Sequence, residues 1–230
     1  MTTQTTKSAP AAVRARAEAA PTGPVRRRTQ AERSEETKRR LLDAAAKVLS
    51  ERGYAGLRTA EISRVAGVSR GAQLHHFPSK DELVLATLRD IYARGLERGR
   101  NRASAIDADA DPIETIIADA SDFFFSEEFF IGLDIVMSAG KDQALRQEAL
   151  AVARGGRLPL EEIWVEALTA RGIPAPLATD LLWLTLAIVR GLAIRTLWQD
   201  ERDHFRRLYD LWRDMVRGYL TTHLAAAGDA

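Results

Sequence analysis

Apolar residues recur at helical spacing from Ser34 onward, and this periodicity constrains the fold more than any other feature of the sequence. A first helix is expected at about 34–52, where Leu41, Leu42, Ala45, Val48 and Leu49 form one apolar stripe. Gly53 follows and is expected to end this helix. Runs of alternating β-branched residues, which would predict strands, do not occur in the chain. We therefore expect an all-α protein.

Cap and turn residues divide this pattern into separate helices. Short helices are expected at 59–66 and 70–76, and a longer one follows Ser79, which forms a capping box with Glu82. Beyond residue 111 the expected helices are 112–126, 128–139, 142–154, 159–172, 176–198 and 202–225. Gly155-Gly156 and Pro159 mark the break between 142–154 and 159–172, because glycine and proline interrupt helices.

Charge divides the chain into a basic and an acidic half. Residues 1–106 carry 21 Lys/Arg and 11 Asp/Glu, a net charge of +10, whereas residues 107–230 carry 12 and 21, a net charge of −9. This asymmetry indicates that the first half meets a polyanion, although chance and a basic tail would also produce it. The absence of cysteine excludes disulfides and thiolate metal sites and fits a reducing cytoplasm.

Residues 1–30 have the composition of a disordered basic tail. The tail ends in Arg26-Arg27-Arg28, which either lies along a DNA backbone or is simply solvated. It lacks the apolar segment of a secretion signal. The most apolar run, residues 181–189, is much shorter than the roughly 20 residues that cross a membrane. We therefore expect a cytoplasmic protein without a membrane partner.

Two short helices joined by Ala66-Gly67-Val68-Ser69, with a longer helix on each side, predict a helix-turn-helix. Gly67 stands where the chain must turn sharply, often with a positive φ. Val68 would insert into the core, and Ser69 would begin the next helix. That second short helix has the size that a DNA major groove admits.

Side chains on this helix have the chemistry of base readers. Arg70 suits guanine and Gln73 suits adenine, with His75 and His76 as further candidates. Arg70 and Gln73 are three residues apart, so we expect both on the same outward face. Thr59 and Lys80 begin the neighbouring helices, and helix N-termini attract phosphates.

The stretch GYAGLRTAEISRVAGVSRGAQLHHFPSKDELV, residues 53–84, resembles the DNA-binding domain of the TetR family of bacterial regulators. The matching positions are Tyr54, Thr59, Ile62, Ala66-Gly67-Val68-Ser69, Gly71, His76-Phe77 and Ser79-Lys80, within residues 34–95. The resemblance implies DNA-facing roles for Ser69, Arg70, Gln73, His75 and His76, and phosphate contacts for Thr59 and Lys80. It departs at Leu74, where the family usually has a tyrosine that contacts phosphate.

Several of these residues have a structural alternative. Gln73 or His75 could lie on a solvated face, and His76 could pack against the fourth helix. Leu74 is interpreted as a core residue rather than as a reader of the thymine methyl group.

The resemblance implies a three-helix DNA-binding domain at 34–95, followed by a larger helical ligand-binding and dimerisation domain at 96–230. Helices 176–198 and 202–225 are unusually apolar, and two from each subunit would form a homodimer interface that includes Leu184 and Val216. The alternative is that both helices are only monomer core. A dimer suits a palindromic operator, because two recognition helices then read two half-sites.

A pocket for an unknown small-molecule effector is predicted from an aromatic cluster and nearby groups: Phe123, Phe130, Met137, Trp164 and Arg190. The alternative is plain core. Neither a metal site nor a cofactor is expected, and no catalytic motif indicates an enzyme. The predicted function is a homodimeric repressor that its ligand releases from double-stranded operator DNA. The alternative is a ligand-independent regulator or an activator with the same DNA-binding domain.

Overall fold

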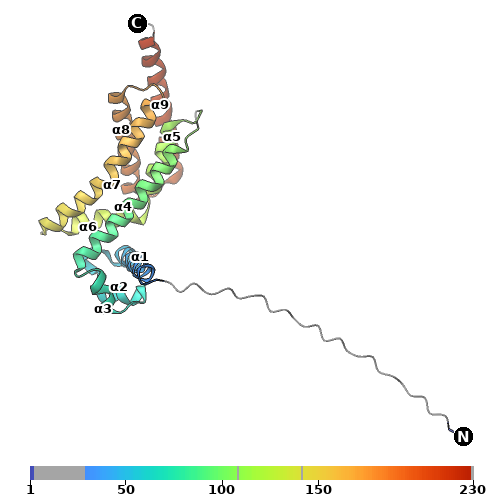
Figure 1. Ribbon diagram of the computed structural model, residues 1–230. Coiled ribbons are helices and arrows are strands. Elements are labelled where there is room, and N and C mark those ends of the chain that lie inside the picture. The colour runs from blue at the N-terminus through green and yellow to red at the C-terminus, as the bar shows by residue number, and fades with distance from the viewer. Residues whose placement is uncertain (3–28, 108, 141, 229–230) are drawn as a thin grey trace.

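The computed structural model describes residues 1–2, 29–107, 109–140 and 142–228, and all regular structure within them is helical (Figure 1). The helices are α1 (Gln30–Gly56), α2 (Thr59–Ala66), α3 (Arg70–His76), α4 (Lys80–Ser104), α5 (Pro112–Phe124), α6 (Glu127–Ser138), α7 (Gln143–Thr169), α8 (Ala175–Arg195) and α9 (Arg202–Gly228). The predicted all-α class is thereby confirmed. The predicted basic arm, residues 26–28, lies outside the described residues.

Helices α1–α3 gather at one end of the molecule, and α4 leads away from them (Figure 1). Their hydrophobic core includes Leu41, Ile62 and Leu88, which are fully buried. Helices α1–α4 do not complete this core alone, because Ile135 of α6 and Ala149 of α7 belong to the same cluster. The first core therefore depends on helices from the acidic half of the chain.

A second core fills the other end, between α5, the later part of α7, α8 and α9. Trp164, Leu182 and Val189 are almost completely buried there. Among the described residues, α8 alone is long and apolar enough to cross a membrane, by length and hydropathy. One side of α8 is buried against α5 and α7, whereas Trp183 and Leu184 on this helix are exposed.

The most extensive helix contact joins α4 and α7, and glycines allow it. A Cβ atom at Gly156 would lie 2.6 Å from Cβ of Tyr92, and one at Gly99 would lie 2.5 Å from Cδ1 of Leu160. The two helices approach each other more closely than larger residues would permit. Tyr92 packs against both cores at this crossing.

Two predicted helix boundaries were wrong. The expected helices 142–154 and 159–172 are the single helix α7, which continues through Pro159. Packing along α4 outweighs the hydrogen bond that proline cannot donate, a loss of about 3 kcal/mol in an unsupported helix. Helix α1 begins earlier than expected, because Thr29 and Glu32 form a capping box. Its helical geometry breaks at Gly53 (φ 65°), as predicted.

The adjacent glycines of α7 provide a matched test of the α4–α7 contact. Gly155→Ala meets open space, so its better helix propensity should raise the free energy of unfolding by about 0.5–1 kcal/mol. Gly156→Ala should lower it by about 1–3 kcal/mol, because the methyl group collides with Tyr92. Urea denaturation measures both values, and equal effects would contradict the close packing.

Candidate nucleic-acid interface

The connection between α2 and α3 has the geometry of a helix-turn-helix. Gly67 ends α2 in the left-handed conformation (φ 63°, ψ 38°), which glycine adopts without strain. Val68 is partly buried against the first core. Ser69 caps α3, and its hydroxyl oxygen accepts a hydrogen bond from the backbone N–H of Ala72 at 3.1 Å. The turn therefore orients α3 relative to α2.

Arg40 of α1 braces this turn, a role that the sequence analysis missed. Its Nη2 donates to the backbone carbonyl oxygen of Ala66, and to that of Gly67 at 3.1 Å. These carbonyls lie at the end of α2, where no residue of that helix can satisfy them. The sequence offered no signal for the contact, because 26 residues separate Arg40 from Ala66.

The outward face of α3 is formed by Arg70, Gly71, Leu74 and His75, with Ser69 exposed just before it. The interpretation of Leu74 as a core residue was wrong, because 44% of its surface is exposed. His76 is partly buried, with its ring centroid 6.4 Å from that of Phe77. Arg70, Leu74 and His75 thus present a guanidinium, an isobutyl group and an imidazole on one accessible surface.

The predicted outward orientation of Gln73 was wrong. Its side chain is 1% exposed, and Nε2 donates a hydrogen bond to the carbonyl oxygen of Phe77 at 3.0 Å. A partner for its Oε1 is lacking in the described part of the chain. Phe77 ends α3, so the amide supplies a donor to a carbonyl at the helix end. Because Arg70 points outward, the two residues do not share a face.

The predicted phosphate anchors lie at the starts of α2 and α4. Thr59 is the first residue of α2, but the N-cap is Arg58. The Lys80 Nζ donates to the Tyr54 carbonyl oxygen at 2.9 Å and lies 4.0 Å from the Tyr54 ring centroid. Burial lowers the pKa of Lys80. Lys80 therefore holds the end of α1 against α4, whereas its phosphate contact stays a prediction.

The same turn at Tyr54 connects the first core to α6. The backbone N–H of Tyr54 donates to Oδ2 of Asp134 at 2.6 Å, and Ser50 donates to Glu127 at 2.6 Å. The Tyr54 hydroxyl donates to Asp81 at 3.1 Å, and burial raises the pKa of Tyr54 to about 12. Side chains of α4 and α6 therefore meet on one turn of α1.

The residues predicted to line a ligand pocket do not share one cavity. Phe123 and Trp164 are buried in the second core, and Phe130 is partly buried on α6. Met137 is 72% exposed, so its assignment to a pocket was wrong. Helix α6 turns this side chain outward, although the residue type suits a core. Arg190 lies in a separate cleft between α7 and α8.

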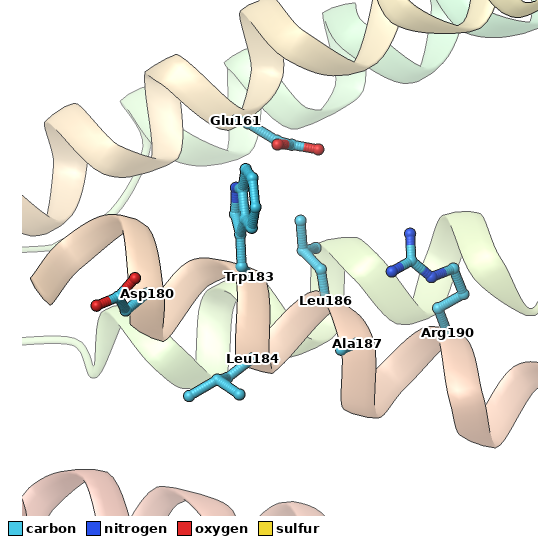
Figure 2. A pocket seen from close by; sticks show the side chains of 7 residues that line it. All are labelled: Glu161, Asp180, Trp183, Leu184, Leu186, Ala187 and Arg190. Atoms are coloured by element: carbon cyan, nitrogen blue, oxygen red, sulfur yellow. The ribbon is translucent and has the colours of Figure 1, made fainter. Parts of the chain in front are cut away.

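That cleft has a volume of about 690 Å³. It is lined by Glu161, Asp180, Trp183, Leu184, Leu186, Ala187 and Arg190. Figure 2 shows Trp183 and Arg190 projecting from α8 toward α7, which carries Glu161. Leu184 projects from the opposite side of α8.

A buried polar group inside the second core was not predicted. Asp119 of α5 is 8% exposed, and Trp164 Nε1 donates to it at 3.2 Å. Arg102 lies 3.5 Å from Asp119 and 2.5 Å from Asp122. Burial raises the pKa of Asp119, while the Trp164 hydrogen bond and Arg102 oppose this rise. Among the described residues, no cluster suited to a metal ion is found.

Helices α8 and α9 carry large apolar side chains on the surface: Trp183, Leu184, Leu211, Met215 and Tyr219. A groove of about 490 Å³ between them is lined almost entirely by apolar residues, among them Ile188, Leu211 and Met215. Val216 is 3% exposed and packs in the second core, so its placement on the dimer surface was wrong.

Comparisons with known proteins agree with this geometry. Residues 41–87 match the profile of the bacterial regulatory proteins of the tetR family. The chain is 43% identical over 192 residues to the HTH-type transcriptional regulator CymR of Pseudomonas putida, covering 84% of this chain and 95% of CymR.

Solved structures have the same fold. A transcriptional regulator from Rhodococcus sp. Rha1 is 25% identical, with a TM-score of 0.60 over 77% of this chain and 94% of that one. A regulator from Saccharomonospora viridis, solved in complex with choline, is 20% identical. Its TM-score is 0.61, over 78% of this chain and 96% of that one.

The burial of Gln73 leads to a stability prediction. Gln73→Ala removes a buried side chain and leaves the Phe77 carbonyl without its donor, so the free energy of unfolding should fall by about 1–3 kcal/mol. The exposed neighbour is the control: His75→Ala should change it by less than about 0.5 kcal/mol. Urea denaturation distinguishes the two variants. If Gln73→Ala left the free energy of unfolding unchanged, the inward orientation of Gln73 would be contradicted.

Proposed function

Because the chain belongs to the TetR family of bacterial transcriptional regulators, we propose that it is a homodimeric repressor which a small molecule releases from a palindromic operator. It is a DNA-binding regulator and not an enzyme. Residues 34–95 form the DNA-binding domain in this proposal, and residues 96–230 bind the ligand and the second subunit. Because bacterial DNA lies in the cytoplasm, we expect the protein to be cytoplasmic.

The DNA surface is the outer face of α3. Arg70 can reach guanine with two N–H groups, His75 can donate to or accept from a base, and Leu74 can contact a thymine methyl group. Ser69 and His76 flank this face, while Thr59 and Lys80 contact phosphates at the starts of α2 and α4. Gln73 supports this face from inside and does not read bases.

The dimer surface is formed by α8 and α9. Their exposed apolar residues surround a groove whose burial would be favourable, because transfer of apolar surface from water drives association. A second copy of the chain supplies the matching surface by two-fold symmetry. The pair then carries two α3 helices, as a palindrome requires.

The observation that carries ligand release is that α4 and α7 each pack into both cores. A ligand that separates these helices in the second core therefore acts directly on the core beneath α3. Asp134 provides a second connection between the ligand-binding domain and the DNA-binding domain. This side chain of α6 binds the turn of α1 that also contacts Lys80. The structure of the choline complex supports small-molecule binding within this fold.

Selection of bound sequences from a random DNA pool tests the proposal with the full chain. The expected result is an inverted repeat whose half-sites lie about one helical turn apart. The selected site is then placed over a promoter that drives a reporter. Reporter output should fall when the chain is expressed, whereas a rise would favour the activator alternative and contradict repression.

Arg70 provides the test of base reading. Arg70→Ala should weaken binding to the selected operator by about 1–3 kcal/mol and binding to random DNA by less, because base contacts add to the charge. Arg154 of α7 is an exposed arginine outside this surface, so Arg154→Ala should leave both affinities unchanged. Titration at one fixed salt concentration gives these values. If Arg70→Ala weakened the affinity for the operator and for random DNA equally, Arg70 would contact phosphate and not bases.

Leu184 provides the test of assembly. Leu184→Arg places a charge in the proposed interface at a cost of several kcal/mol, so sedimentation velocity should show monomers with weaker operator binding. Each chain should still fold, because Leu184 is 52% exposed within one subunit. The matched control is Leu158 of α7, which is 49% exposed. Leu158→Arg should remain dimeric, and a dimeric Leu184→Arg would remove this surface from the interface.

A further inference from the structure

Arg157 of α7 is partly buried against aromatic rings, and among the described residues no acceptor for its guanidinium is found. Its guanidinium carbon lies 5.1 Å from the ring centroid of Phe123 and 5.2 Å from that of Phe124. Within the described ranges the guanidinium makes neither a hydrogen bond nor an ion pair. A guanidinium has five N–H donors, and a charge removed from water is costly unless it is paired. Burial accordingly lowers the pKa of Arg157.

The buried acidic side chain of the second core, Asp119, already has partners. Asp119 and Arg157 line the same small cavity of about 20 Å³, together with Tyr92, Gly156 and Leu160. However, Asp119 accepts from Trp164 and is paired with Arg102, which also pairs with Asp122. The second core is therefore bordered by Arg102, which is paired with carboxylates, and by Arg157, which is not paired within the described residues.

A second arginine approaches the same aromatic group from the cleft between α7 and α8. The Arg190 guanidinium carbon lies 5.7 Å from the Phe124 centroid, and in Figure 2 its side chain extends toward α7. Arg157 and Arg190 repel each other, and Glu161 is the acidic side chain that attracts Arg157 most strongly. An anion near Phe124 would accept hydrogen bonds from both guanidinium groups and reduce their repulsion.

Resting on the ligand-binding role proposed above, we propose that the effector is an organic anion with an apolar body. Its carboxylate binds Arg157 and Arg190 beside Phe124, and its body packs against the apolar wall formed by Tyr92, Phe123 and Leu160. Arginine suits this role because its planar donors match a carboxylate.

Beside Phe124 the two guanidinium groups favour an anion over a cation such as choline, whereas Glu161 and Asp180 line the outer cleft. Aromatic rings attract quaternary ammonium groups, but Phe123 and Phe124 already contact the guanidinium groups. Asp119, which would neutralise a cation, is paired with Arg102. The 20 Å³ cavity holds about one water, so a larger body must separate Tyr92 of α4 from Gly156 of α7. Binding would then displace α4, whose first turns belong to the DNA-binding domain.

Thermal unfolding of the purified chain without DNA or ligand tests whether Arg157 is unpaired. Arg157→Met removes an unmatched charge and keeps an apolar stem, so the Tm should stay equal or rise. Arg102→Met is the matched control, because it breaks two ion pairs of the same cavity and should lower the Tm by several degrees. A comparable fall in both variants would give Arg157 a structural role and overturn the proposal.

The second arm uses benzoate, phenylacetate, 3-phenylpropionate and octanoate, each with its neutral amide, and benzyltrimethylammonium as the cation. At least one carboxylate should raise the Tm of the natural chain by about 2 °C or more, its amide should not, and Arg157→Met should abolish the shift. The proposal is overturned if no carboxylate raises the Tm, or if the rise persists in Arg157→Met. It is also overturned if the amides, the ammonium compound or sodium sulfate at matched ionic strength raise the Tm equally. Because neither arm contains DNA, failed operator binding would leave both results interpretable.

Discussion

The close approach of α4 and α7 is the contact on which the rest of the structure depends. Gly156 and Gly99 remove the side chains that would hold the helices apart, and Tyr92 fills the crossing. The early residues of both helices pack around α1–α3, and their later residues pack around α5 and α8. Two cores thereby share one pair of rigid elements, and packed interiors transmit displacement instead of absorbing it.

The turn of α1 at Gly53 and Tyr54 is the second connection between the two ends. Asp134 of α6 binds the backbone N–H of Tyr54, while Lys80 of α4 binds its carbonyl oxygen. The break at Gly53 leaves the Tyr54 N–H available to Asp134, whereas the Tyr54 carbonyl oxygen accepts from the Leu57 backbone N–H as well as from Lys80. A rearrangement of α6 would therefore reach the start of α4 through a short series of hydrogen bonds.

The buried charges separate structural from functional arginines. Arg102 is held by Asp119 and Asp122, and Arg40 satisfies carbonyls at the end of α2, so each completes the hydrogen bonding of the fold. Arg157 completes nothing within the described chain. A guanidinium that is partly removed from water gains from an anionic partner, because the partner supplies the acceptors that the fold does not. The proposed effector site thus lies where two guanidinium groups approach the same aromatic ring.

The sequence by itself determined the local structure: the helical class, the break at Gly53, the left-handed turn at Gly67 and the capped start of α3. These features depend on hydrophobic period, glycine conformation and capping, which act over a few residues. Tertiary structure decided the continuity of α7 through Pro159 and the outward position of Met137. It also decided that Gln73 and Val216 face inward. A short or uniformly apolar helix offers more than one face to a core, and only its neighbours select which face is buried.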